Sequence, residues 1–564
     1  MRLLLLTLSI FTTYLTYAQF PKFHIGGLAR SLSTSAHLDK EDTINNDISQ
    51  DFNIVFDLAI KGELNKHVNL YSELRLGSNL EVFDTSSSYL NLRRLLIFGD
   101  LNDYISFEIG DIDLQMTPFT LWNSNEEGEV NENSIFSNYR DIQRYENFNN
   151  GNHWRRQGVT VFGNKSVSKN DTISYKFFGT REFASNGISN PDIYIFGGDV
   201  NYDFKNFYSG INYIDLFSNN KGISLDTNFH NHVVSSKSAL KIKNLEFSSE
   251  LGLSKLTNSS STLNNKWIDG EFVSLGFKAN FSKNLFISLN YRSVSDDFSS
   301  PGAQTKRINY SMSPNLFPQV SNSLINREVS VNEIITDINF IRSQSFYNRT
   351  IDYSLDKFNP IFGVSEPYGL ATPNRRGFSS KIQFNDTSKT IYLYGKCAVL
   401  SDLIGEGVDQ KRKYLSFSIA SNVYINKILN FNKTILFKSG FYYSNSKRKH
   451  SPEIFVDDVD FNNSILDIGI EMEAIKNFYL IFGYKSINAS GIDYLSVRND
   501  DFIISSFDKL QLDINQKISS FGLKYNFNKK SSLLFNYQEM KFSNNLSDSN
   551  FKIDQFFILV QIRF

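Results

Sequence analysis

The chain has 564 residues, of which 41% are hydrophobic and 15% aromatic, and its formal net charge is −1 from 58 basic and 59 acidic residues. This balance leaves no electrostatic footprint for nucleic acid, so nucleic acid is excluded as a partner. The one cysteine, Cys397, excludes an intramolecular disulfide. No segment after Phe20 is long and apolar enough to be a spanning helix.

The first residues predict export. Arg2 precedes an apolar run from Leu3 to Leu15, and the small-residue site Thr16-Tyr17-Ala18 follows. This pattern indicates a Sec signal peptide over residues 1–18, cut after Ala18. An uncleaved membrane anchor is the alternative, but the run is shorter than the roughly 18 apolar residues that span a bilayer. The mature chain, 19–564, shows no linker or shift in composition, so we expect a single domain.

The mature chain is dominated by alternating strands. Phe52 to Ile60 is apolar at every second residue, and the same pattern recurs in hairpins at Phe272–Val294, Leu466–Lys485 and Phe521–Tyr537. A period of two gives a strand one apolar and one polar face. Strands that alternate this consistently are not buried on both faces, so they predict a barrel wall or a one-sided sheet.

The connections between these strands alternate in length. Short turns are expected at 64–66, 205–206, 282–284 and 528–530, and longer polar connections at 37–46, 217–228 and 444–460. Short periplasmic turns and long extracellular loops are typical of outer-membrane barrels. We therefore predict an all-β transmembrane antiparallel β-barrel of about 22 strands, within a range of roughly 18–24, with both termini in the periplasm.

The chain ends on its most regular alternating stretch, "FKIDQFFILVQIRF". Phe556, Ile558, Val560, Ile562 and Phe564 form one apolar face, which predicts a closing strand that pairs with a first strand around 23–33. The stretch resembles the C-terminal targeting signal of bacterial outer-membrane β-barrel proteins. The resemblance implies porin or channel type, recognition of the strand ending in Phe564 by the barrel-assembly machinery, and residence in the lipid of a Gram-negative outer membrane. The richness in Asn, Lys and Phe resembles proteins of Bacteroidota.

Two connections, about 113–153 and 296–375, are longer than loops usually are without a function. Either could fold inward as a constriction, fold outward to meet a ligand or protein partner, or remain a solvated extracellular loop. The first is rich in charge, and its candidate constriction residues are Glu126, Glu129, Arg140, Arg144, Arg155 and Arg156.

The alternation of side chains along each strand also predicts which charged residues face the lumen, and it places Cys397 on the lipid face. Positive and negative charges are nearly balanced among these lumen-facing residues, whereas a pore dedicated to anions or cations should show rings of charge of one sign. The charges could pair across neighbouring strands or line a wet channel. The lumen-facing candidates are Asp57, Lys61, Glu73, Arg75, Lys278, Arg292, Glu471, Glu473 and Lys485.

Signals for catalysis and metal binding are weak. His230-Asn231-His232 could ligate a metal, but surface histidines are the favoured interpretation. Val456–Asp460 lacks the glycine turn of a calcium loop and is interpreted as an acidic loop tip. No local motif nominates a nucleophile with its base. We therefore expect no enzyme activity, catalytic residues, cofactor or metal.

These observations favour a porin-like passive channel for small hydrophilic solutes or oligosaccharides. The alternative is a structural or accessory barrel subunit of an outer-membrane secretion or surface-display complex, with a protein partner at the extracellular loops.

Overall fold

The computed structural model describes residues 21–40, 47–79, 87–123, 132–146, 152–183, 192–219, 228–259, 267–304, 364–449, 456–498, 504–546 and 549–564. The predicted signal peptide lies outside these ranges. Among the described residues, no helix is long and apolar enough to cross a membrane.

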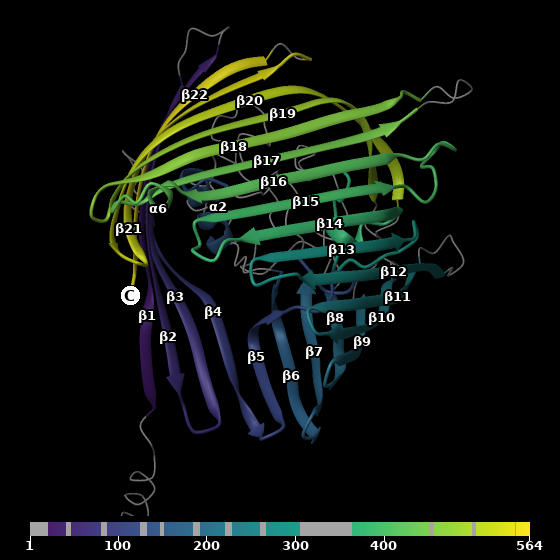
Figure 1. Cartoon of the computed structure of the whole chain (residues 1–564). Helices are drawn as coiled ribbons and strands as arrows, with labels where there is room; N and C mark the ends of the chain where they lie inside the picture. The colour runs from purple at the N-terminus through teal and green to yellow at the C-terminus, as the bar shows by residue number, and fades with distance from the viewer. Residues whose placement is uncertain are drawn as a thin grey trace, which may run out of the picture.

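Strands make up nearly all of the described structure (Figure 1). The strands are β1 (Lys22–Lys40), β2 (Asp47–Glu63), β3 (Val68–Asn79), β4 (Ser87–Asn102), β5 (Ile105–Leu114), β6 (Trp154–Ser168), β7 (Asp171–Phe183), β8 (Asp192–Phe204), β9 (Phe207–Asn219), β10 (Asn228–Ile242), β11 (Leu245–Ser259), β12 (Trp267–Asn280), β13 (Leu285–Val294), β14 (Arg375–Asn385), β15 (Ile391–Ser401), β16 (Lys413–Tyr424), β17 (Ile435–Arg448), β18 (Val459–Ile475), β19 (Phe478–Arg498), β20 (Ile504–Asn528), β21 (Ser531–Asn544) and β22 (Ser549–Arg563). The helical elements are α2 (Ser134–Glu146), α6 (Ile425–Ile428) and the 3-10 turn η4 (Gly369–Ala371).

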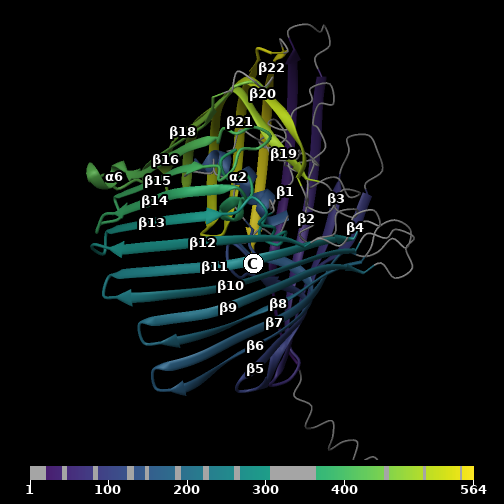
Figure 2. The same cartoon turned by 90° about the vertical axis from the view of Figure 1, so that its right-hand side faces the viewer.

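The strands form one closed 22-stranded antiparallel sheet, in which each strand pairs with its neighbours in sequence and β22 returns to β1. The closing register runs from Leu28 opposite Arg563 to Lys40 opposite Phe551. Closure pairs the backbone groups of both terminal strands and leaves no edge in lipid. The predicted fold class and the predicted closing strand are confirmed, with β22 beside β1 (Figure 2). The first strand extends further than the predicted 23–33.

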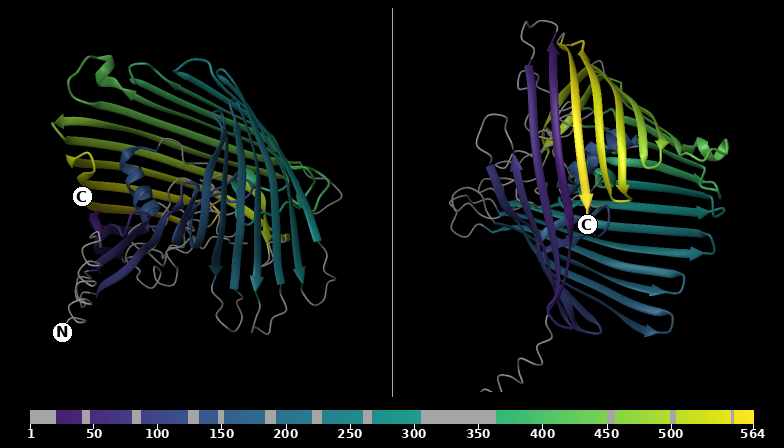
Figure 3. Two further views of the ribbon diagram at one scale, coloured as in Figure 1. Left: turned by 90° about the horizontal axis from the view of Figure 1, so that it is seen from below. Right: turned by 90° about the vertical axis from the view of Figure 1, so that its left-hand side faces the viewer.

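The connections are segregated by length between the two ends of the barrel, as predicted. One end, the short-turn end, carries tight turns such as 205–206, 243–244 and 529–530, together with the connection that holds α6. The opposite end, the loop end, carries the long connections, among them 115–153 and 295–374. Since the strand number is even, β1 begins and β22 ends at the short-turn end (Figure 3).

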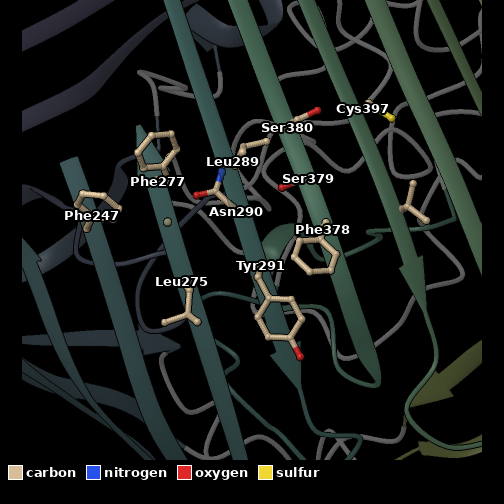
Figure 4. A pocket seen from close by; sticks show the side chains of 12 residues that line it. Phe247, Leu275, Phe277, Leu289, Asn290, Tyr291, Phe378, Ser379, Ser380 and Cys397 are labelled. Atoms are coloured by element: carbon tan, nitrogen blue, oxygen red, sulfur yellow. The ribbon is translucent and has the colours of Figure 1, made fainter. Parts of the chain in front are cut away.

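The outer wall is apolar, as expected for a surface exposed to lipid. Leu289 and Phe378 are 49% and 66% exposed there, while their neighbours Ser288 and Arg292 are buried inside. A shallow groove of about 530 Å³ on this wall is lined largely by outward side chains, among them Leu289, Phe378 and Cys397 (Figure 4). Cys397 therefore lies among the lipid-face residues with which parity had placed it.

The interior differs from a uniformly polar lumen. Two clusters of buried apolar residues lie inside the ring of strands, one around Leu32, Ile481 and Leu559 and the other around Leu114, Phe272 and Val294. Both clusters include residues from the two long connections, such as Phe136 and Phe298. Inward positions can be apolar here because chain segments folded into the lumen cover them.

Candidate functional site

The helix α2 lies inside the barrel, and its sequence explains why it forms (Figure 3). The Asn133 side chain accepts a hydrogen bond from the Ile135 backbone N–H at 3.4 Å, which caps the first turn. Ile135, Phe136 and Ile142 recur at helical spacing and are buried in the first interior cluster. The helix contacts β19 and β20.

The N-terminus of α2 is anchored to β18 and β19 by polar contacts. Glu132 forms an ion pair with Lys485, whose Nζ also lies 3.7 Å from the Asp467 carboxylate. The Ser134 hydroxyl donates to Glu471 at 2.8 Å, and the Asn133 amide donates to the Phe482 carbonyl at 2.8 Å. The Asn133 side chain packs directly against β18, so that a Cβ at Gly469 would lie 1.2 Å from Asn133 Nδ2. A side chain at position 469 would therefore displace the Asn133 amide.

The C-terminus of α2 is anchored on the opposite side, to β2, β3 and β4. Tyr145 donates its hydroxyl to Asp57 at 2.5 Å. Asp57 also accepts from Arg75 Nε at 2.6 Å and from Arg93 at 2.5 Å, and it is only 1% exposed. Burial, reinforced by Asp57 and Glu73 and opposed by Arg93, raises the pKa of the Tyr145 phenol far above its usual range, so the hydroxyl stays a donor.

A β-bulge supplies one of these arginines. The register of β3 and β4 shifts between Glu73 and Leu74, so that Glu73 pairs with Arg94 and Leu74 with Leu92. Arg93, which stands opposite no residue in the β3–β4 register, then points inward, to Asp57 and Glu73. Bulges commonly re-aim a side chain in this way.

The charge cluster continues from β4 to β5 and β6. Asp113 lies 3.1 Å from Arg94 and 3.4 Å from Arg155, and Arg155 also interacts electrostatically with Glu73. Arg156 is fully buried at the start of β6. The structure thus brings the predicted Arg155 near the predicted lumen residue Glu73, which shares Arg93 as a partner with the predicted Asp57.

The two long connections also pack on each other inside the barrel. The Trp122 backbone N–H donates to the Gly302 carbonyl at 3.0 Å, and the Ser300 hydroxyl donates to the Thr120 carbonyl at 3.3 Å. Within the second connection, the Gln304 side chain donates to the Ala371 carbonyl at 2.9 Å. The Phe119 ring stacks on Phe272 of β12 at 4.1 Å between centroids. Residues 115–123, 295–304 and 364–374 therefore line one side of the interior, facing β10–β13.

A network of buried ion pairs holds this second connection at the loop end. Arg292 pairs with Glu366, and Arg375 lies 2.8 Å from Asp402. Arg412 bridges Asp402 at 3.1 Å and Asp493 at 3.2 Å. Among the described residues, most interior charges lie beside a charge of the opposite sign. This favours the interpretation that the charges pair across neighbouring strands.

Other predicted residues have simpler surroundings. Lys278 pairs with Glu246 at 2.7 Å near the short-turn end, and Lys61 lies 5.9 Å from the Phe98 ring. The Glu473 carboxylate accepts hydrogen bonds from the backbone N–H groups of Thr434 and Asn477 at 3.2 Å each. It therefore stabilises two turns and does not line the solute pathway. Arg140 and Arg144 lie on α2. Glu126 and Glu129 fall outside the described residues.

The predictions from sequence did not include α2 itself, Tyr145 or Arg93. A helix signal was present, because Asn133-Ser134 precedes apolar residues at 135, 136 and 142. Arg93 gave no signal, since in simple alternation only one of two consecutive residues faces inward. The bulge that reorients it depends on tertiary pairing.

No family model matches the sequence, and no curated protein matches it. Among solved structures, the chain is similar to the P pilus usher (PapC) translocation pore, with 7% identity and a TM-score of 0.39 over 95% of this chain and 99% of that one. It is also similar to Pseudomonas aeruginosa OccK2 (OpdF), with 8% identity and a TM-score of 0.32 over 96% and 98%. For P. aeruginosa OccK5 (OpdH), the identity is 11% and the TM-score 0.34, over 96% of this chain and 98% of that one. Likeness at this level concerns the barrel fold alone, so function is argued from this chain's own geometry.

Proposed function

We propose that the protein is a porin-like passive channel of the Gram-negative outer membrane, not an enzyme, which admits small hydrophilic solutes or oligosaccharides through a narrowed lumen. The observation that carries the proposal is the anchoring of α2 inside the closed barrel. A 22-stranded wall encloses more space than its own side chains fill. Segments held inside it by Lys485 and Asp57 then set the size of the remaining path.

The pairing of opposite charges in the interior affects which solutes the channel would select. The Asp57–Arg75–Arg93 cluster and the Asp467–Lys485–Glu132 cluster each combine both signs. Opposed charges at a narrowing orient polar solutes without a strong preference for one sign. Uncharged or zwitterionic solutes, including oligosaccharides, suit such a lumen best.

Export and assembly complete the proposal. Residues 1–18 act as a Sec signal peptide, and the barrel-assembly machinery recognises the last strand through Phe564. In the folded barrel the Phe564 ring stacks on Phe56, with centroids 5.4 Å apart, and its backbone bonds to Gly27. The terminal aromatic is therefore part of the seam between β22 and β1.

Solute flux into proteoliposomes tests this function. We expect pentoses and hexoses to enter, larger oligosaccharides to enter progressively more slowly, and anionic and cationic solutes of equal size to differ little. Protein-free liposomes and liposomes with heat-unfolded protein are the controls. Impermeability to every solute would instead favour the accessory-subunit alternative, whose partner would then be sought by purification from native membranes.

A further inference from the structure

Three potential metal ligands meet on the outer wall of the barrel near the loop end. His230 and His232 lie near the start of β10, and Asp215 lies near the end of β9. In the antiparallel register His232 is directly opposite Asp215, and His230 is two residues away. Because side chains alternate along a strand, His230 and His232 share one face, while Asn231 and Val233 are buried on the other.

The ligand atoms are already close. His230 Nε2 lies 2.7 Å and His232 Nδ1 lies 3.3 Å from the same oxygen, Asp215 Oδ1, and the three ligand atoms lie within 4.8 Å of one another. Ligands at the usual zinc–nitrogen and zinc–oxygen distances in a tetrahedron stand about 3.3 Å apart. The His232–Asp215 separation already has this value, and the His230–Asp215 contact needs to open by roughly 0.6 Å.

We propose that Asp215, His230 and His232 bind a divalent transition-metal ion of the zinc type. Two imidazole nitrogens and one carboxylate oxygen suit zinc, copper or nickel, whereas calcium and magnesium take mainly oxygen ligands. Three protein ligands leave a further coordination position for water or an outside anion. The histidine and aspartate side chains are 38%, 29% and 21% exposed, so an ion can reach them.

A metal ion bound to these three residues would link β9 to β10 at the loop end. A metal ion that binds the folded protein but not the unfolded chain stabilises the folded state by mass action. The sequence favoured surface histidines at His230-Asn231-His232 and did not indicate Asp215, which joins them through strand pairing. The proposal does not depend on the channel function.

Zinc binding to the full-length, chelator-treated barrel tests the proposal, using protein purified in detergent without a histidine tag. At pH 7.5, competition with a chromophoric chelator is expected to give one zinc per chain. Asp215→Asn and His232→Gln should each weaken binding by about 100-fold or more, since loss of second-shell partners alone costs 10–100-fold. Affinity should fall at pH 5.5, because protons compete for imidazole.

His24→Gln is the matched control. His24 lies 3.7 Å from Glu63 and forms a single histidine–carboxylate pair remote from the site, so its loss should leave zinc binding unchanged. Heat-modifiable gel mobility must show that every variant is folded. A second readout is Trp267, whose ring centroid lies 5.7 Å from that of His232, so bound copper should quench its fluorescence. The proposal fails if wild-type protein shows no saturable 1:1 binding, or if the folded Asp215 and His232 variants bind as tightly as wild type.

Discussion

The Leu289→Arg variant is expected to assemble far less folded barrel than Asn290→Arg, although the two residues are adjacent on β13. Leu289 points outward and is 49% exposed, while the Asn290 amide points inward and lies 3.1 Å from the Ser288 hydroxyl. An arginine on the lipid face near the bilayer midplane costs about 2–4 kcal/mol, whereas a hydrated interior accommodates the charge.

Folded yield by heat-modifiable gel mobility, after refolding into detergent or lipid, measures the difference. Leu289→Met serves as the control for the loss of leucine packing, and it should fold like wild type because it keeps volume and polarity. Equal yields from the two arginine variants would contradict the assignment of faces, and with it the membrane-spanning wall.

The second large effect is expected for Asp57→Asn. Asp57 accepts hydrogen bonds from Arg75, Arg93 and Tyr145 and is only 1% exposed. The amide keeps the shape but removes the charge that compensates two buried guanidinium groups. Loss of one partner from a buried ion pair costs about 3–5 kcal/mol.

The free energy of unfolding in urea, followed by tryptophan fluorescence in micelles, measures this loss. Asp192→Asn is the matched control, since Asp192 pairs with an Arg181 side chain that is 49% exposed. Exposed pairs contribute about 0–1 kcal/mol, so the control should change little. If the two substitutions destabilise equally, the buried cluster does not hold the C-terminus of α2 as described.

The wall of the barrel could be predicted from sequence because its rules are local. Strand alternation, turn length and the terminal Phe564 each act within a few residues, and closure then follows from the absence of unpaired edges in lipid. The predicted lumen residues Asp57, Arg75 and Lys485 lie inside for the same reason.

The interior could not be predicted to the same extent, because its contacts join distant parts of the chain. Glu132 meets Lys485, and Thr120 meets Ser300, through tertiary packing that no periodicity records. The Arg93 bulge and the Asp215–His230–His232 group depend on register between strands. The sequence left open whether the long connections fold inward, fold outward or remain solvated loops, and the described parts of both fold inward. It indicated neither a helix nor apolar clusters there.

Single-channel conductance in planar bilayers tests the central claim that α2 narrows a water-filled barrel. Asn123 and Asn152 lie at the ends of the segment to be removed, and they are hydrogen-bonded, with Asn152 Nδ2 2.5 Å from the Asn123 carbonyl oxygen. Residues 124–151 can therefore be replaced by a short glycine linker without opening the wall. Lys278→Gln, an inward substitution at the short-turn end, is the control. The account predicts a small conductance for the intact protein and the control, and a severalfold larger one after excision. Unchanged conductance after excision would contradict the constriction, and silence of both forms would contradict the channel.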